Sequence, residues 1–309
     1  MSGIGVILNP HSRSNRYNPE RIERLAFIVG DKGSCHATQD VLDVRAIAEE
    51  FAARGIEILC ISGGDGTIHH TISTFIHTYG ERPLPKIALL RGGTVNNVAT
   101  AIGLKGTPEE ILSRLILQYH AQKDLHTEQV HCLCINGHYG FLFGNGFVSN
   151  FIREYIRMGQ GGGSNIAILM TRLIVGSFFQ TKYSLQMIHR FDAAVSIDGR
   201  PWPFKNYVMV SAGAVEAFGI GVEPFHRARE RAGFFHVVAY AMTPRQICGE
   251  FWRVWRGKHM QSENRLDALA HELVIHFKEP MQYMIDGELY EPTNTVTVRS
   301  GPALTMVVV

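Results

Sequence analysis

Hydrophobic and polar residues follow different patterns in the two parts of this chain. Up to about residue 125, apolar runs of strand length alternate with amphipathic helical runs, which is typical of a parallel α/β domain. Beyond that point, short runs rich in Val, Ile, Phe and Tyr are separated by Gly and Pro, which predicts mainly antiparallel strands. We therefore predict a Rossmann-like α/β domain over residues 1–125 and a mainly antiparallel β-sandwich domain over residues 126–309, with final strands that are free to return to the first domain.

The same patterns predict the individual elements. In the first domain, strands are expected at residues 3–8, 33–37, 57–61 and 86–90, and helices at 20–29, 41–54, 68–79 and 109–119. In the second, strands are expected at residues 131–136, 139–143, 184–189, 193–197, 207–211, 234–241, 271–276 and 282–285. Asp198-Gly199 is a dipeptide that favours a tight hairpin turn.

Composition is that of a folded chain with a sizeable core. The 309 residues are 45% hydrophobic and 19% charged, which suffices for two domains. A formal net charge of +2 is too small to indicate a nucleic-acid partner. Five cysteines, an odd number, fit a reducing compartment, and the polar segment 9–24 directly after residues 1–8 does not resemble a secretory signal. We expect a cytoplasmic protein.

A glycine-rich turn follows the apolar run 56–61 and precedes a predicted helix. It reads Gly63-Gly64-Asp65-Gly66-Thr67. A strand, a glycine turn and a helix in this order bring backbone N–H groups and the positive helix end close to a phosphate. Asp65 then stands where Mg²⁺ or a substrate hydroxyl would lie. The simpler alternative is a tight connection in which Asp65 and Thr67 only cap the helix.

A second glycine turn has the same layout and weakens that alternative. The apolar run 86–90 is followed by Gly92-Gly93-Thr94-Val95-Asn96-Asn97 and then by another apolar segment. Turns at the carboxyl ends of neighbouring parallel strands line one cleft. The sequence therefore predicts a polyphosphate-binding site at this end of the first sheet.

Four segments in the right order resemble the diacylglycerol kinase catalytic family, which includes sphingosine kinases and bacterial lipid kinases and is distantly related to NAD kinases. They are residues 6–12 (Val-Ile-Leu-Asn-Pro-His-Ser), 63–67 (the GGDGT signature), 93–96 (similar to GTxN) and 281–288 (similar to the DGE strand). The resemblance implies an ATP-dependent lipid kinase with Mg²⁺, acting on a membrane-derived lipid of diacylglycerol or sphingoid type.

The resemblance also implies roles for individual residues. The nucleotide would be held by residues from three segments, namely Asn9, Pro10, Ser12, Gly63, Gly64, Asp65, Gly66, Thr67, Gly93, Thr94 and Asn96. Asp65, Asp286 and Glu288 would be catalytic, with Asp65 and Asp286 also contacting the metal.

Asp286 and Glu288 have two interpretations. Residues two apart on a strand face the same side, so both carboxylates would point into one cleft, with Asp286 as base and Glu288 as its partner. Alternatively, Asp286-Gly287 forms a type I′ hairpin turn and Glu288 is solvated. The family resemblance favours the first interpretation.

Three positions depart from the family pattern by lacking a carboxylate. Asn97 follows the GTxN segment where many members have Asp, Val148 replaces the acidic residue of a GxGFD segment, and Ala232 replaces the Asp of a later Asp-Gly. The last change argues against the structural Mg²⁺ of the bacterial branch. A catalytically weak nucleotide or lipid sensor is therefore the alternative function, and NAD kinase, whose other motifs are not found, is a weaker one.

One apolar segment, residues 166–179, bears on the partners. It is shorter than the ~20 residues of a membrane span and carries Arg172. A core helix is the simplest interpretation, but nearby aromatic and basic residues are also compatible with peripheral contact at a membrane. A homodimer is equally compatible with the sequence.

Overall fold

The computed structural model describes residues 3–30, 33–38, 40–93, 96–159, 163–216, 223–256 and 262–309. The chain divides into two compact units. Unit 1 comprises Met1–Val130 and Ala303–Val309, and unit 2 comprises His131–Pro302. The chain therefore passes between the units twice.

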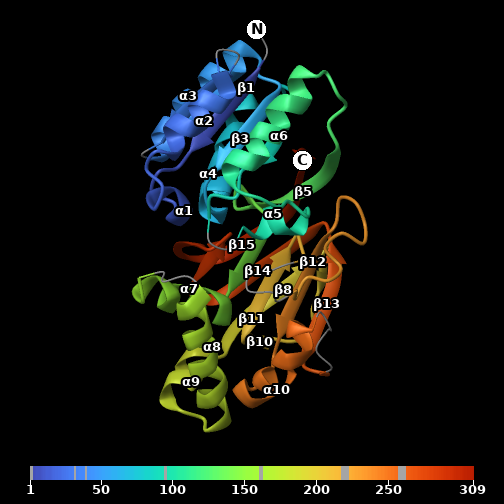
Figure 1. Cartoon of the computed structure of the whole chain (residues 1–309). Helices are drawn as coiled ribbons and strands as arrows, with labels where there is room; N and C mark the ends of the chain where they lie inside the picture. Colours follow the sequence, from blue (N-terminus) through green and yellow to red (C-terminus); the bar gives the residue numbers. More distant parts are fainter. Residues whose placement is uncertain are drawn as a thin grey trace. The chain divides into compact units, whose positions relative to one another are not determined.

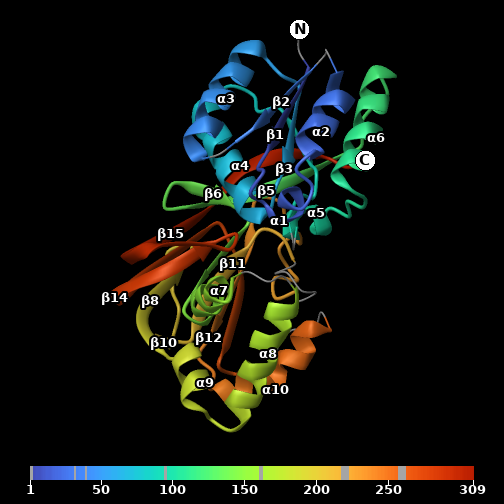
Figure 2. The same ribbon diagram turned by 60° about the vertical axis from the view of Figure 1, so that its left-hand side comes forward.

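Unit 1 is built on parallel strands in the order β2-β1-β3-β4. Its strands are β1 (Ile4–Leu8), β2 (Gly33–Ala37), β3 (Ile58–Ser62) and β4 (Lys86–Leu89), joined at Met306 by the end of β15 (Glu288–Val307). Its helices are α1 (Arg13–Arg16), α2 (Arg21–Val29), α3 (Val41–Arg54), α4 (Asp65–Tyr79), α5 (Asn97–Ala101) and α6 (Pro108–His120). Helices α2 and α6 lie together on one face of this sheet, and α3 and α4 on the other (Figures 1 and 2). β1 and β3 are buried along their whole length, as the apolar runs predict.

Helix α3 shows why this part of the sequence was readable. The Asp40 side chain accepts hydrogen bonds from the backbone N–H groups of Leu42 and Asp43, and the Asp43 carboxylate accepts one from the backbone N–H of Asp40. Gly55 ends the helix in the left-handed conformation. The predicted bounds, residues 41–54, are confirmed.

Unit 2 is mainly antiparallel. Its strands are most of β5 (Thr127–Ile135), β6 (His138–Gly140), β7 (Leu142–Asn145), β8 (Phe191–Ile197), β9 (Arg200–Pro201), β10 (Asn206–Tyr207), β11 (Met209–Gly213), β12 (Phe235–Tyr240), β13 (Arg265–Ala270), β14 (Glu272–Ile285) and the first part of β15. The order is β13-β12-β11-β7-β14-β15, and every pairing in it is antiparallel. The first half of β14 pairs with β8 and its second half with β7, so these strands enclose one core. Parallel pairing in unit 1 and antiparallel pairing in unit 2 confirm the predicted fold class.

In the described part of unit 2, four helices accompany the strands. They are α7 (Phe147–Arg157), α8 (Gly163–Phe178), α9 (Lys182–Met187) and α10 (Pro244–Trp255), and α8 contacts the other three (Figure 2). The strand predicted at residues 184–189 is wrong, because this segment lies largely in α9. Thr181 begins that helix by accepting a hydrogen bond from the backbone N–H of Ser184. Among the described residues, no helix combines the length and apolar character needed to cross a bilayer.

Candidate nucleotide and phosphoryl-transfer site

The first glycine turn connects β3 to α4 as predicted. Gly64 is the extended N-cap residue of α4, and Asp65 is its first residue. The opening N–H groups of a helix have no partner within it and carry a partial positive charge. The turn therefore presents a site suited to an anion, with the Asp65 carboxylate beside it.

The two glycine turns pack backbone against backbone. A Cβ atom on Gly93 would lie 2.4 Å from the Cα of Gly64, and one on Gly92 would lie 2.7 Å from the backbone N of Gly63. None of these glycines adopts a positive φ, so close approach explains them better than conformational freedom does. On the other side of the first turn, a Cβ on Gly63 would meet the side chain of Thr67 at 2.4 Å.

Replacing Gly93 by alanine should destabilise this site strongly. The added methyl group meets backbone atoms, which cannot move aside as a flexible side chain would, so we expect a loss of about 2–3 kcal/mol in the free energy of unfolding. Urea denaturation measures it. Gly249→Ala in α10 is the matched control, because its Cβ would meet nothing within 4 Å and should leave stability unchanged or slightly raised. A Gly93→Ala protein as stable as wild type would contradict the packing.

Asp65 is held by the segment after the second turn. Its Oδ1 accepts a hydrogen bond from the backbone N–H of Asn97 at 2.9 Å, and its Oδ2 accepts one from Asn97 Nδ2 at 3.3 Å. Burial raises the pKa of Asp65 to about 6, against the opposing effect of the backbone N–H groups of Asn97, Asn96 and Val98. The pKa of Asp65 therefore lies closer to neutral pH than that of a fully solvated carboxylate.

Asn96 closes the second turn. Its side chain accepts a hydrogen bond from the backbone N–H of Gly93 and donates one to the Gly93 carbonyl, both at 3.0 Å. Asn96 is buried and has a φ of 54°, a left-handed conformation that Asn tolerates better than most residues. Thr94, also predicted to bind the nucleotide, lies outside the described residues.

The segment after β1 joins the two turns. Asn9 Nδ2 donates to Thr67 Oγ1 at 2.8 Å, and Ser12 Oγ donates to the carbonyl of Gly92 at 3.1 Å. Pro10 lies between them and is half-buried. Residues predicted from three distant segments are therefore connected to one another within unit 1.

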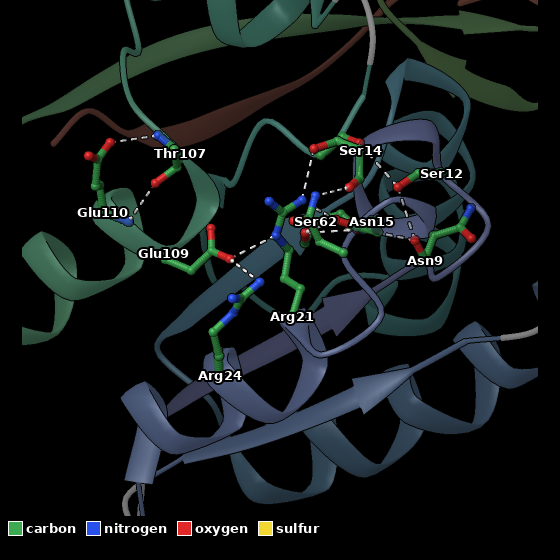
Figure 3. A network of polar contacts seen from close by, with 12 residues as sticks. Asn9, Ser12, Ser14, Asn15, Arg21, Arg24, Ser62, Thr107, Glu109 and Glu110 are labelled. Carbon is green, nitrogen blue, oxygen red and sulfur yellow. Dashed lines mark hydrogen bonds and ion pairs between the residues drawn. The ribbon is translucent and has the colours of Figure 1, made fainter.

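A polar network beneath this segment was not predicted (Figure 3). Asn15 is buried and its Nδ2 donates to the carbonyls of Asn9 and Ser62, at 2.8 and 3.1 Å. Arg21 donates through Nη1 to Asn15 Oδ1 at 3.0 Å and through Nε to Glu109 Oε1 at 2.9 Å. These contacts fix the loop that carries Asn9. Asn15 lies on the short helix α1, and nothing in the sequence around it indicates that it contacts Ser62 or Arg21.

The predicted carboxylates of unit 2 lie on a hairpin turn. Asp286 and Gly287 have φ values of 48° and 90°, and Ile285 pairs with Glu288 across them. Two consecutive positive φ values are those of a type I′ turn. The prediction that Asp286 and Glu288 share one face of a strand is therefore wrong in its geometry, and the alternative hairpin, with an exposed Glu288, describes the turn.

Asp286 itself is buried, which the hairpin alternative did not anticipate. Its Oδ2 accepts from the backbone N–H of Phe141 at 2.9 Å, its Oδ1 accepts from that of Leu142 at 2.8 Å, and its own N–H donates to the Leu142 carbonyl. The catalytic roles of Asp286 and Glu288 stay predictions.

The Asp198-Gly199 hairpin repeats this arrangement elsewhere in unit 2. Asp198 and Gly199 have φ values of 47° and 75°, which confirms the predicted turn. Oδ1 of Asp198 accepts from the N–H groups of His271 and Glu272, and its own N–H donates to the Glu272 carbonyl. A turn aspartate that caps two successive amides of a neighbouring strand is thus a structural device that this fold uses twice.

The family comparison matches the part of the chain that carries the glycine turns. The family model described as "Diacylglycerol kinase catalytic domain" matches residues 3–127. Residues 3–127 are therefore similar to the diacylglycerol kinase catalytic domain. The match includes Asn9, Ser12, both glycine turns and Asn97, and so confirms the resemblance for three of the four segments; residues 281–288 lie outside it.

Curated relatives of this catalytic domain match over a similar stretch. Diacylglycerol kinases from Staphylococcus aureus strains bovine RF122 / ET3-1 and MRSA252 are each 28% identical over 123 residues. The match spans 38% of this chain and 37% of each relative's length.

Solved structures extend the likeness of fold to the whole chain. A diacylglycerol kinase from Bacillus anthracis str. Sterne is 17% identical with a TM-score of 0.67, and the match covers 100% of this chain and 97% of that one. A further structure from the same organism, of a protein proposed to be a diacylglycerol kinase, is 19% identical with a TM-score of 0.75 and is covered to 95%. At these identities the likeness concerns the fold alone.

Two of the three positions that depart from the diacylglycerol kinase pattern, Val148 and Asn97, make structural contacts of their own. Val148 is buried, and a Cβ on Gly144 would lie 2.7 Å from its Cγ1, so it packs on the preceding strand. Ala232 is exposed. Asn97, in the family domain itself, binds Asp65 with both its backbone and its side chain.

A second charged cluster lies in unit 2, around Asp267. Its carboxylate contacts Arg227 Nη1 at 2.9 Å, His236 Nε2 at 3.0 Å and Arg265. Burial alone would raise the pKa of Asp267, but the contacts with His236, Arg227 and Arg265 hold it well below the usual value. His226 also lies close enough to share a metal ion with His236 and Asp267. Two guanidinium groups already neutralise the carboxylate, which favours a structural ion network over a cation site.

Proposed function

We propose that this chain is an ATP-dependent lipid kinase that transfers the γ-phosphoryl group to a hydroxyl of a diacylglycerol-like or sphingoid-like lipid. The observation that carries the proposal is the pair of glycine turns, packed backbone to backbone, with the Asp65 carboxylate at the start of α4. The similarity of residues 3–127 to the diacylglycerol kinase catalytic domain supports the proposal, as do the names of the curated relatives.

The nucleotide phosphates would lie against the two turns. Phosphoryl transfer requires mainly positioning and compensation of negative charge, which the first N–H groups of α4 provide at the Gly64–Thr67 turn. Asn9 and Ser12 would border the nucleotide from the β1 side, because they are hydrogen-bonded to Thr67 and to the Gly92 carbonyl.

The donor set at the turn fits Mg²⁺ that is held together with a nucleotide. Mg²⁺ prefers oxygen ligands and commonly takes one or two carboxylates, with phosphates and waters completing its shell. Asp65 supplies a half-buried carboxylate where the phosphates would lie. Bound there, the ion would neutralise charge on the phosphates.

The acceptor proton needs a base, and Asp286 is our candidate, with Glu288 as its partner. The carboxylate of Asp286 accepts hydrogen bonds from two backbone N–H groups, which fix its position. Asp198 makes the same kind of contacts on another hairpin, so this geometry alone does not identify a catalytic residue. The catalytic role of Asp286 therefore rests on the family resemblance, and the substitutions of Asp286 described in the Discussion test it.

A catalytically weak nucleotide or lipid sensor is a second candidate function, favoured by one observation. Asn97 donates hydrogen bonds to both oxygens of Asp65, which occupies lone pairs that a metal ion would otherwise use. NAD kinase remains a weaker alternative because its other motifs are missing from the sequence.

Transfer of labelled γ-phosphate from Mg²⁺-ATP separates these functions. We expect label in a lipid when diacylglycerol or a sphingoid base is offered, and none in NAD⁺. Label in NAD⁺ alone would identify the weaker alternative. ATP binding by equilibrium dialysis without transfer to any acceptor would support the sensor and contradict the kinase.

A further inference from the structure

Exposed apolar side chains gather on one short stretch of unit 2. Among the described residues, eleven large hydrophobic side chains are exposed, and seven of them fall between residues 156 and 185. They are Ile156, Met158, Ile168, Val175, Phe178, Phe179 and Leu185. Isolated exposed apolar residues are ordinary on a protein surface, but a cluster of them is typical of a surface that contacts another protein or a membrane.

Helix α8 is apolar on two opposite sides. Ile166, Leu169 and Leu173 are buried at helical spacing, and this side serves the packing of the helix within unit 2. Ile168 and Val175 form a second stripe with Phe178, at spacings of one and two helical turns, and are 54%, 51% and 74% exposed. A helix with only a core function needs one apolar side.

The turn that joins α8 to α9 (Figure 1) carries two of these exposed side chains. Phe178 and Phe179 are adjacent, both 74% exposed, with ring centroids 6.0 Å apart. The turn is anchored from behind, because Thr181 N–H donates to the carbonyl of Gly176, and Arg245 Nε of α10 donates to that of Phe178. The two rings are therefore presented on a fixed corner of the unit.

The segment that forms this surface carries only basic charged residues, and Glu154, just before it, lies 3.7 Å from Arg157. Between residues 155 and 191 the sequence contains Arg157, Arg172, Lys182 and Arg190, and no aspartate or glutamate. Arg172 belongs to the exposed side of α8 and lies over the ring of Tyr183, 4.1 Å from its centroid. Lys182 follows the phenylalanine corner and is exposed. Apolar side chains flanked by cations match the boundary between acyl chains and anionic headgroups.

We propose that the α8–α9 surface, defined by Ile168, Val175, Phe178, Phe179 and Leu185 with Arg172 and Lys182, docks the protein on an anionic lipid bilayer. The phenylalanine corner enters the apolar boundary while the cations pair with lipid phosphates. This attachment is separate from the proposed phosphoryl transfer, since it needs neither nucleotide nor turnover.

Vesicle co-sedimentation of the full chain tests this surface. We expect binding to phosphatidylcholine vesicles that contain phosphatidylglycerol, weaker binding to phosphatidylcholine alone, and loss of the difference at high salt. Phe178→Ala/Phe179→Ala should lower the partition coefficient at least about 100-fold, because two phenylalanine rings lose their burial in the bilayer. Lys182→Gln should lower it several-fold, since one cation near an anionic surface contributes about 1 kcal/mol.

Phe27→Ala is the matched control, because Phe27 is 87% exposed but lies on α2 of unit 1. We expect this variant to bind vesicles as the wild-type protein does. Equal thermal unfolding of all variants shows that the fold is intact. No preference for anionic vesicles, or equal binding by the double variant and Phe27→Ala, would overturn the proposal. A concentration-dependent dimer that only the double variant loses, without vesicle binding, would assign the surface to a second copy of the chain instead.

Discussion

Replacing Asp65 by asparagine should abolish phosphoryl transfer while making the protein more stable at pH 8. The carboxylate carries the charge that the proposed reaction needs, and loss of such a group lowers rates by about 10³-fold or more. The amide keeps one oxygen to accept the N–H of Asn97, so the turn remains closed. Labelled-phosphate transfer and thermal unfolding of the same preparation measure the two effects.

The gain in stability follows from the direction of the pKa shift. Burial raises the pKa of Asp65 to about 6 in the folded protein, so ionisation there opposes folding once the pH exceeds the unfolded value near 4. The folded state binds more protons between pH 4 and 6, and the penalty is complete above pH 6. Asparagine removes it, which we expect to stabilise the protein by about 1–3 kcal/mol at pH 8 and by nothing at pH 4.

The same titration should appear in the activity of the wild-type protein. Below pH 6 Asp65 is protonated, so we expect kcat/KM to fall about tenfold for each pH unit. Asp124→Asn, which changes an exposed carboxylate of unit 1, is the control for both readouts. An Asp65→Asn protein with unchanged activity would refute the catalytic assignment, and one with lower stability at pH 8 would refute the pKa argument.

Asp286 should be needed both for stability and for turnover, and two substitutions separate these roles. Asp286→Ala leaves the buried N–H groups of Phe141 and Leu142 without their acceptor and forces alanine into a left-handed conformation. We expect a loss of about 3 kcal/mol in the free energy of unfolding. Asp286→Asn keeps an accepting oxygen and tolerates that conformation, so it should lose only about 1 kcal/mol.

If Asp286 takes the acceptor proton, the folded Asp286→Asn protein should lose at least about 100-fold in kcat. Asp198→Asn supplies the matched control, since it changes the same kind of turn aspartate with the same pattern of amide contacts. It should keep wild-type activity. Full activity of Asp286→Asn would leave this residue a purely structural cap, and urea denaturation would show whether even that role holds.

The first glycine turn and its neighbours were readable because their signals are local. Strand, glycine turn and helix follow within a few residues, and the capping box at Asp40 and Asp43 fixed α3 at its predicted bounds. The same is true of the hairpin at Asp198-Gly199, whose residues are the ones that tolerate positive φ.

The errors of the sequence prediction have both local and distant causes. Residues 184–189 were predicted as a strand, but the cap at Thr181 and packing against α8 make this segment largely helical. Family resemblance favoured a shared face for Asp286 and Glu288, whereas the turn chemistry of Asp-Gly prevailed. Asn15, Arg21 and Glu109 join only through the fold, because nothing near any of them in sequence indicates the others.

The return of the chain to unit 1 bears on how the protein is made. Met306 pairs with Ile87 of β4, the backbone N–H of Val308 bonds to the carbonyl of His126, and Leu304 is buried. During synthesis on the ribosome, unit 1 therefore begins first and is completed last. Until residues 303–309 emerge, the backbone groups of β4 that receive them form an open sheet edge, the kind of surface on which nascent chains associate with one another or with chaperones.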